Sequence, residues 1–259
     1  MRAFVYDRSF EGLLSAVFDA YALKSFPEIL CGPADPPLPE ARSAHRVEVT
    51  PEKPVRVFAA LAKKLSERGL RNLILVWLSE EKGSDFLLFR FIRKIFDAGS
   101  GRGLPERDFG DPDVLAVERL ARRVGRKAER YAGFARFQKT RQGVYVALIE
   151  PEHNVLPLLL RHFGDRFGDR PWMLYDVGRG YGIMRDSGNR REEFREVFLD
   201  ERLIEGGGLR PDLLAEGEEL LQSLWRGYHE AAAVRERLNP RLQRGFMPKK
   251  FWKYLTEFP

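Results

Sequence analysis

The 259-residue sequence predicts an α+β protein in which several helices flank a small antiparallel sheet. Two observations support this class. Apolar residues recur at helical spacing through most of the chain, and two pairs of short apolar segments in the C-terminal half are joined by glycine-containing turns, as in two β-hairpins. A Gly/Pro-rich loop at 99–112 separates a mainly helical region, 1–98, from an α+β domain, 113–259.

The N-terminal region begins with a short predicted strand, 2–6, and a helix that starts at Ser9. Residues 31–44 are rich in proline and alanine and predict an extended loop. The segment 45–50 alternates as a strand does.

Three more helices are predicted before the loop at 99–112. The first opens at Pro54, which suits a helix start. Its side chains expected to point inward are Val55, Phe58, Leu61, Ala62 and Leu65. The stretch LRNLILVWLSEE is apolar nearly all round and predicts a buried helix, with a buried strand as the alternative. Ser84 is the predicted cap of the third helix.

The C-terminal domain opens with a helix over 113–131. Hairpins follow, with turns near 140–143 and 178–180, and a helix between them has Pro157 in its first turn. A long helix is predicted from Pro211, with an inward face of Leu221, Leu224, Trp225, Tyr228 and Ala232. A basic, aromatic helical tail closes the chain.

Composition limits the classes of function. A single cysteine, Cys31, excludes an internal disulfide and a cysteine-ligated metal site within the chain. No apolar run approaches the roughly 18 residues of a membrane span, and Asp7 lies where a signal peptide would be apolar. We therefore expect a cytoplasmic protein without a membrane partner. No metal or other cofactor is predicted.

Positive charge is concentrated in one stretch. Between Arg119 and Gln142 there are nine Lys or Arg and one acid, Glu129, a local charge of +8; the whole chain, with 44 basic and 38 acidic residues, carries +6. On a helix, six of these side chains fall within an arc of about 140°. This basic face consists of Arg119, Arg122, Arg123, Arg126, Lys127 and Arg130. A bound phosphate backbone would offset the repulsion among them, whereas the alternative is a solvated face paired with acids elsewhere in the fold.

A second basic segment, LNPRLQRGFMPKKFWKYL at 238–255, contains no acid and has four aromatic residues among its cations. Such a pattern is typical of single-stranded nucleic-acid binding, where each stacked base contributes about 1–3 kcal/mol. The alternative is that Phe251 and Trp252 dock this tail onto the core. Beyond the basic face, the candidate nucleic-acid contacts are Phe134, Arg136, Lys139, Arg141, Arg241, Arg244, Lys249, Lys250 and Trp252.

Catalytic signals are weaker. The four histidines show no metal-ligand spacing, and the glycine-rich stretches AGSGRG and VGRGYG fit no nucleotide-binding motif. The polar segment HFGDRFGDR at 162–170 and the strand after it supply four candidates for acid–base or phosphate chemistry: His162, Arg166, Asp176 and Arg179. A structural ion-pair network is the alternative.

The sequence also resembles a known family. The resemblance is carried by FVYDRSFEGLLSAVFDAY, GFARFQKTRQGVYVALIEPEHNVLPLLLRHFGDRF, WMLYDVGRGYGIMRD and LWRGYHEAAAVRERLNPRLQRGFMPKKFWKYL. These segments are similar to a bacterial family of unknown function whose members are labelled as DNA metabolism or DNA repair proteins. The resemblance implies a radical-SAM DNA modification or repair protein as partner, and some members are fused to a uracil-DNA-glycosylase-like domain. It brings no established reaction or active site. That family often has Glu and His at the positions of Lys127 and Glu129.

Three hypotheses follow. The first is an accessory protein that holds single-stranded or damaged DNA for the radical-SAM partner. The second is a DNA-processing enzyme, glycosylase-like or nuclease-like, that uses the His162 cluster. The third is a protein–protein adaptor whose basic face meets an acidic surface.

Overall fold

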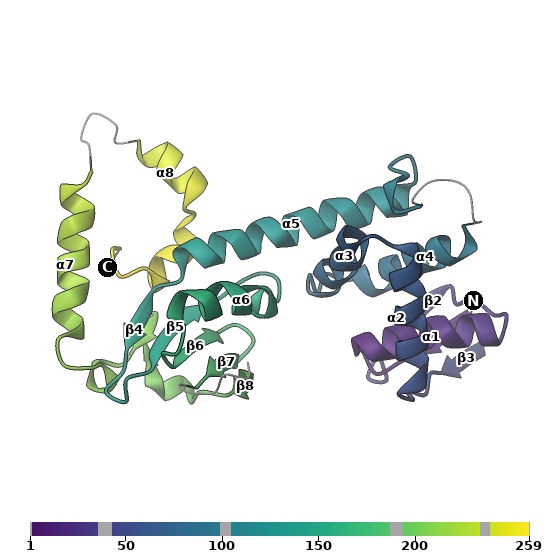
Figure 1. Cartoon of the computed structure of the whole chain (residues 1–259), viewed down its shortest axis with the longest axis horizontal. Helices are drawn as coiled ribbons and strands as arrows, with labels where there is room; N and C mark the ends of the chain where they lie inside the picture. Colours follow the sequence, from purple (N-terminus) through teal and green to yellow (C-terminus); the bar gives the residue numbers. More distant parts are fainter. Residues whose placement is uncertain (1, 36–42, 99–104, 187–193, 234–238, 259) are drawn as a thin grey trace. The chain divides into compact units, whose positions relative to one another are not determined.

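The computed structural model describes residues 2–35, 43–98, 105–186, 194–233 and 239–258 (Figure 1). The chain forms two compact units, 1–125 and 126–259. Their boundary lies inside the helix α5 (Pro112–Phe134) and is therefore further along the chain than the loop at 99–112. Parts of two predicted loops, 36–42 and 99–104, lie outside the described residues.

The first unit contains a three-stranded parallel sheet that the sequence did not predict. Its strands are β1 (Arg2–Val5), β2 (Ile29–Cys31) and β3 (Ser43–Arg46), in the order β2-β1-β3. Val5 pairs with Cys31 on one side and with Arg46 on the other. The strand expected over 45–50 is shifted in the structure: β3 begins two residues earlier and ends four residues earlier, over the four residues that pair with β1.

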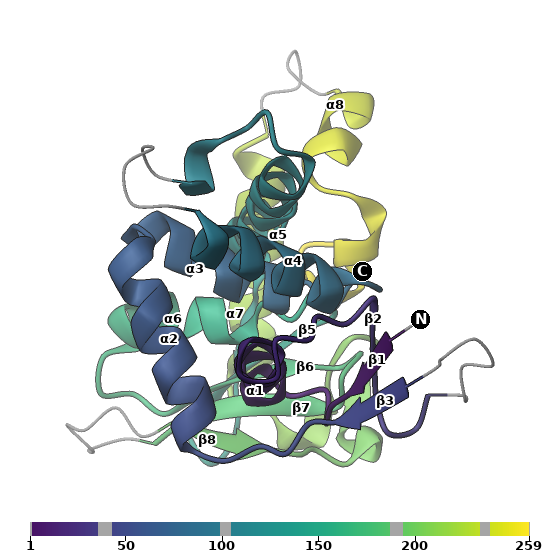
Figure 2. The same cartoon turned by 90° about the vertical axis from the view of Figure 1, so that its right-hand side faces the viewer.

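Four helices accompany this sheet: α1 (Phe10–Ala22), α2 (Glu52–Lys64), α3 (Glu67–Trp77) and α4 (Ser84–Asp97). The helix predicted from Ser9 is confirmed as α1, and Ser9 is its cap, because its hydroxyl accepts a hydrogen bond of 2.8 Å from the N–H of Gly12. Figure 2 shows α1 end-on, between α2 and the sheet. The apolar stretch in α3 is a helix and not a strand. The residue before α4 is Gly83, in the left-handed region at φ +82°, so Ser84 is the first helical residue and not the cap.

The inward face predicted for α2 is wrong in part: Leu61 and Leu65 are buried as predicted, but Val55, Phe58 and Ala62 are exposed. Val55 is 67% exposed and Phe58 is 38% exposed, whereas Val57 and Leu61 are buried. The helix begins two residues before Pro54, and the side it turns toward the core is set by Pro54, Val57 and Leu61, which follow i, i+3, i+7 spacing.

The second unit contains a five-stranded mixed sheet, which corrects the prediction of a purely antiparallel one. The strands are β4 (Phe137–Lys139), β5 (Tyr145–Ile149), β6 (Trp172–Asp176), β7 (Tyr181–Arg185) and β8 (Phe194–Val197), in sequence order across the sheet. Both predicted hairpins, β4–β5 and β6–β7, are confirmed. However, β5 and β6 are parallel, because the helix between them, α6 (Leu156–Phe167), returns the chain to the starting edge of β5.

The two faces of this sheet are covered by different segments. On one face, Ala147, Ile149 and Leu174 pack with apolar residues of α6, of the end of α5 and of the C-terminal tail. On the other face, Val146 and Leu148, which alternate with Ala147 and Ile149 along β5, pack with Leu209 and Leu214. Figure 1 shows α6 over the first of these faces.

The remaining elements are short, with one exception. They are η1 (Pro105–Arg107), η2 (Glu201–Leu203), β9 (Ile204–Glu205), β10 (Gly208–Leu209), η3 (Pro211–Leu213), α8 (Pro240–Phe246) and η5 (Lys249–Tyr254). The exception is α7 (Glu218–Ala231), which starts seven residues after Pro211. Its predicted inward face is wrong, because Leu221, Leu224 and Tyr228 are exposed. None of the described helices combines the length and the apolar character that crossing a bilayer requires.

Candidate nucleic-acid interface

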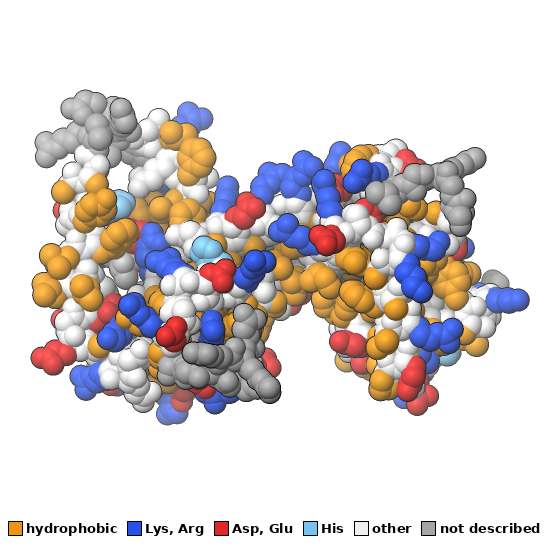
Figure 3. Space-filling view, viewed as in Figure 1, with side chains coloured by type: hydrophobic (Ala, Val, Ile, Leu, Met, Phe, Trp, Pro, Cys, Tyr) orange, Lys and Arg blue, Asp and Glu red, His pale blue; other side chains and the backbone are white. Residues whose placement is uncertain are grey.

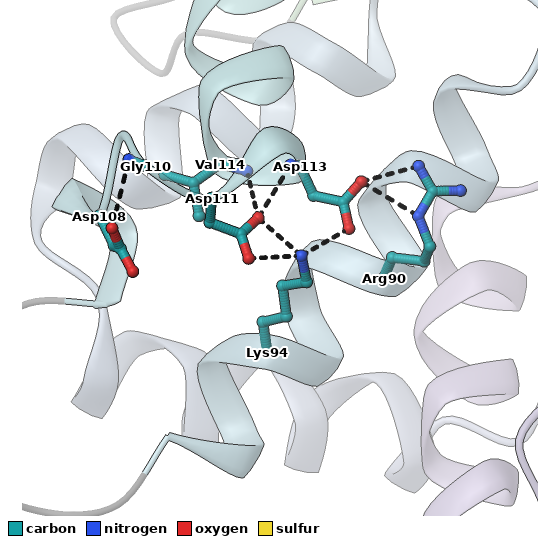
Figure 4. Close-up of polar contacts among 7 residues, drawn as sticks. All are labelled: Arg90, Lys94, Asp108, Gly110, Asp111, Asp113 and Val114. Carbon is teal, nitrogen blue, oxygen red and sulfur yellow. Dashed lines mark hydrogen bonds and ion pairs between the residues drawn. The ribbon is translucent and has the colours of Figure 1, made fainter.

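The start of α5 is held by carboxylates and cations (Figure 4). Asp111 Oδ1 accepts hydrogen bonds from the backbone N–H groups of Asp113 and Val114, at 2.8 and 3.2 Å, and so caps the helix. Lys94 Nζ lies 2.6 Å from Asp111 and 2.8 Å from Asp113, and Arg90 donates to Asp113 at 2.8 Å. Burial alone would raise the pKa of each carboxyl, but these hydrogen bonds lower both pKa values. The two aspartates therefore remain ionised and fix the start of α5 to α4.

The helix is amphipathic, as its sequence predicts. The apolar side chains opposite the basic face are all buried: Val117, Leu120, Ala121, Val124, Ala128 and Tyr131. Burial of this stripe determines which way the basic face points. Figure 3 shows Lys and Arg side chains gathered along the outer side of α5.

Two arginines of the basic face are paired with acids. Arg123 Nη2 donates to both carboxylate oxygens of Glu81, at 2.7 Å each. Arg122 Nη2 lies 3.2 Å from Glu118 Oε1, but Glu118 also accepts a hydrogen bond from Arg68. One carboxylate charge is thus shared by two guanidinium groups, and this pairing leaves an excess of positive charge.

Three arginines of the basic face have no such partner. Arg119, Arg126 and Arg130 are exposed, and the structure gives them no hydrogen bond or ion pair with any described residue. At about 100° and 1.5 Å per residue, they fall within roughly 40° of one another and span about 16 Å along the helix. We call these three residues the unpaired stripe. Their donors are open to a ligand along one line of α5.

The tail continues the positive charge next to the end of α5. Glu152 Oε2 lies 2.8 Å from Lys127 Nζ, and the same carboxylate accepts a hydrogen bond from Lys250. These hydrogen bonds, from Lys127 first and Lys250 second, lower the pKa of Glu152 to about 2. Beside it, Glu150 pairs with Lys253. At Glu152, one acid is again shared by two cations.

The aromatic residues of this region are used for packing. Phe251 is 3% exposed, and its ring lies 4.8 Å from that of Tyr131 and 5.1 Å from that of Phe134. Trp252 is half-buried and stacks on Phe258 at 4.7 Å. The structure thus places the candidates Phe134 and Trp252 where they attach the tail to the second unit. Base stacking on these rings would require them to leave those contacts.

Three candidate nucleic-acid contacts follow α5 in the chain, and one of them is paired with a buried acid whereas two are exposed. Arg136 binds the buried carboxylate of Glu257 through Nη2 at 2.6 Å and Nε at 3.1 Å, and Trp225 Nε1 donates to the same carboxylate at 3.1 Å. Burial alone would raise the pKa of Glu257, but the hydrogen bonds from Arg136 lower it. Arg136 is therefore a structural cation. Lys139 and Arg141 are exposed, and Arg141 donates only to a main-chain carbonyl, at 3.3 Å.

The remaining tail candidates lie at the surface. Arg241 and Arg244 are exposed on α8, and Lys249 Nζ lies 5.8 Å from the ring centroid of Trp252. Phe246 is 69% exposed, which makes it the ring of this tail that is open to a base. The sequence singled out Trp252 instead, because alternating aromatic residues do not reveal which of them the core covers.

The four catalytic candidates do not form one group. Asp176 is fully buried at the end of β6, and Arg179 Nη1 donates to its Oδ2 at 2.9 Å and to the carbonyl of Pro151 at 2.9 Å. Burial raises the pKa of Asp176, against the opposing effect of Arg179. His162 and Arg166 are exposed on α6, and among the described residues neither has a hydrogen bond or ion pair to Asp176. Asp176 and Arg179 thus clip the β6–β7 turn to the segment that follows β5. Within the described ranges, no group of three or more His, Cys, Asp or Glu is placed to hold a metal ion.

The residues that sequence reasoning missed are the acids. Glu81 and Glu152 decide which members of the basic face are neutralised, and both lie far from α5 in sequence. The one available signal was the segment IEPEHN, in which Glu150 and Glu152 directly follow an apolar strand and must emerge at its end.

The fold and this surface define a two-unit protein of mixed helices and sheets, with an arginine-faced helix that contributes to both units. Residues 82–257 match the model of the family described as a domain of unknown function, DUF4130. The chain belongs to this family, and the match includes all of α5, the mixed sheet and the tail. No curated protein and no solved structure matches the chain.

Proposed function

We propose that this chain is a nucleic-acid-binding accessory protein, and that it holds single-stranded or damaged DNA along the basic face of α5 for a partner enzyme. The single observation behind the proposal is the unpaired stripe. Arg119, Arg126 and Arg130 lie in line and exposed, without an acid among the described residues, although neighbouring arginines on the same helix do have acidic partners. Arginine binds phosphate in a bidentate manner, which suits this arrangement to a nucleic-acid backbone.

The role in DNA repair or modification and the radical-SAM partner are parts of this proposal that rest on the resemblance of the sequence. The surface itself supports a polyanionic ligand. The distribution of partners also favours backbone contact over base stacking, because Phe251 and Trp252 are engaged in the core.

The proposal is tested by fluorescence anisotropy with a labelled single-stranded oligonucleotide. The variant Arg119→Gln/Arg126→Gln/Arg130→Gln should bind far more weakly than the wild type. A matched control with the same loss of net charge is Arg195→Gln/Arg202→Gln/Arg210→Gln, because each of those arginines is already paired with an aspartate.

The control triple variant should retain wild-type affinity. Equal weakening of both triple variants would mean that net charge alone attracts the oligonucleotide, and no weakening in the stripe variant would refute a role for α5. Absence of any DNA binding by the wild type, together with co-purification of a protein partner after nuclease treatment, would favour the adaptor hypothesis.

A further inference from the structure

The helix α7 is oriented with its polar side toward the body of the second unit. Glu219, Gln222 and Arg226 line a cleft of about 610 Å³, bounded also by the hairpin at 205–208 and by the tail. The apolar side chains of α7 lie on the opposite side and are exposed. An amphipathic helix normally buries its apolar side, whereas the leucines and Tyr228 of α7 are exposed; Trp225, at the edge of this face, donates a hydrogen bond to Glu257.

This face is large and contains no charge. At 100° per residue, an arc of about 160° contains only apolar or small side chains. They are Leu220, Leu221, Leu224, Trp225, Gly227, Tyr228, Ala231 and Ala232. Of its large side chains, the three leucines and Tyr228 are the most exposed, at 60–65% each, and Trp225 is 40% exposed. Figure 3 shows hydrophobic side chains, in orange, gathered over α7 at the left of the view.

The exposed area is comparable with half of a small protein–protein interface. Three leucines and one tyrosine at this exposure present roughly 500 Å² of apolar surface, which is near the upper end for a monomer. Two such faces together would bury about 1,000 Å², the lower limit for a specific interface.

We infer that this face is a self-association surface, on which α7 of one chain packs against α7 of a second copy. A two-fold pair brings identical residues together, so it requires a surface that does not repel itself. The chain carries a net charge of +6, and its basic face and tail would repel a second copy. The apolar face of α7 has no charge to repel, and the area matches what a weak dimer needs.

The test is sedimentation equilibrium of the full chain without nucleic acid, over a wide range of protein concentration. The wild type should shift from monomer to dimer as its concentration rises. Leu221→Glu/Leu224→Glu should raise the dissociation constant at least tenfold, and its far-UV circular dichroism should be unchanged, because both side chains are exposed. The matched control is Val55→Glu/Phe198→Glu, which adds the same charge at exposed apolar residues outside α7 and should still dimerise.

A wild type that stays monomeric at every concentration would overturn the inference, as would a dimer that persists in Leu221→Glu/Leu224→Glu. Raised salt offers a second check: an uncharged interface should not weaken, whereas dissociation by salt would assign the dimer to charged surfaces and overturn the inference. The experiment contains no nucleic acid, so its outcome is independent of whether the basic face binds DNA.

Discussion

The salt dependence of DNA binding gives the most quantitative test of the basic face. Each phosphate contacted on a single strand contributes about 0.7 to the slope of log affinity against log salt, and each contact on a duplex about 0.9. The unpaired stripe supplies three arginines over about 16 Å, which is the axial length of roughly five phosphates on one strand of a duplex. Replacement of all three with glutamine should therefore reduce the slope by about 2 on single strands and weaken binding about a hundredfold at ~0.1 M salt.

The opposite change is expected at Glu152. Its carboxylate is shared by Lys127 and Lys250, and with a pKa of about 2 it is fully ionised at neutral pH. Glu152→Gln should free both lysines for phosphate, and thus tighten binding and steepen the slope by about 1.4, from two single-strand contacts at about 0.7 each. The assay is anisotropy of a labelled oligothymidine titrated at several salt concentrations.

The control variant Arg195→Gln/Arg202→Gln/Arg210→Gln should have the wild-type slope. The reasoning would be refuted by a stripe variant whose slope equals that of the wild type. It would also be refuted by weaker binding in Glu152→Gln, because that result would mean that the pairing of cations with acids does not determine which side chains reach phosphate.

Three further predictions concern stability, measured by urea denaturation. Arg136→Met and Glu257→Leu should each lower the free energy of unfolding by about 3–5 kcal/mol, because each leaves the other charge of the pair without its partner. The double variant should lose less than the sum of the two single losses. Strictly additive losses would contradict the buried pair. Burial would raise the pKa of Glu257, but Arg136 lowers it below the unfolded value of about 4.3. The ionised carboxyl therefore contributes stability above about pH 4.3, and this contribution is lost as the pH falls further. In Glu257→Gln, the free energy of unfolding should depend less on pH in this acidic range. Gly207→Ala should destabilise the protein far more than Gly143→Ala. Both glycines have φ above +80°, which costs alanine about 1–2 kcal/mol, but of the two only at Gly207 would the added Cβ meet a carbonyl oxygen, at 1.7 Å. Equal losses of stability in the two variants would show that this close approach is absent.

The elements that the sequence predicted well are those determined by local patterns. The helical period of α5 indicated its buried and basic sides, and glycine-containing turns indicated both hairpins. Strand pairing between distant segments was not predicted: β1 pairs with a strand about forty residues away, and β5 and β6 are parallel only because a helix separates them. A short strand carries no signal of the partner it will find.

Periodicity has a second limit, which α2 and α7 illustrate. It indicates that a helix has an apolar side, but not what covers that side. In α2 the buried side is rotated from the predicted one, so Val55 is exposed. In α7 the predicted side exists, but it is exposed, and Leu224 contacts solvent instead of the core. An interior position and an interface position look the same in sequence, because both require apolar side chains.

Pairing within the basic face has a physical consequence for α5. Arg126 and Arg130 are four residues apart, and like charges at this spacing repel by a few tenths of a kcal/mol in a helix. Arg123 is relieved of such repulsion by Glu81, whereas the described structure supplies no acid to Arg126 or Arg130. A phosphate backbone across the stripe would remove this repulsion as well as supply hydrogen bonds, so stabilisation of α5 and affinity for the ligand are thermodynamically linked. If the proposed binding occurs, the guanidinium groups of Arg126 and Arg130 would weaken the free helix and stabilise the bound one, which a merely solvated charged face would not do.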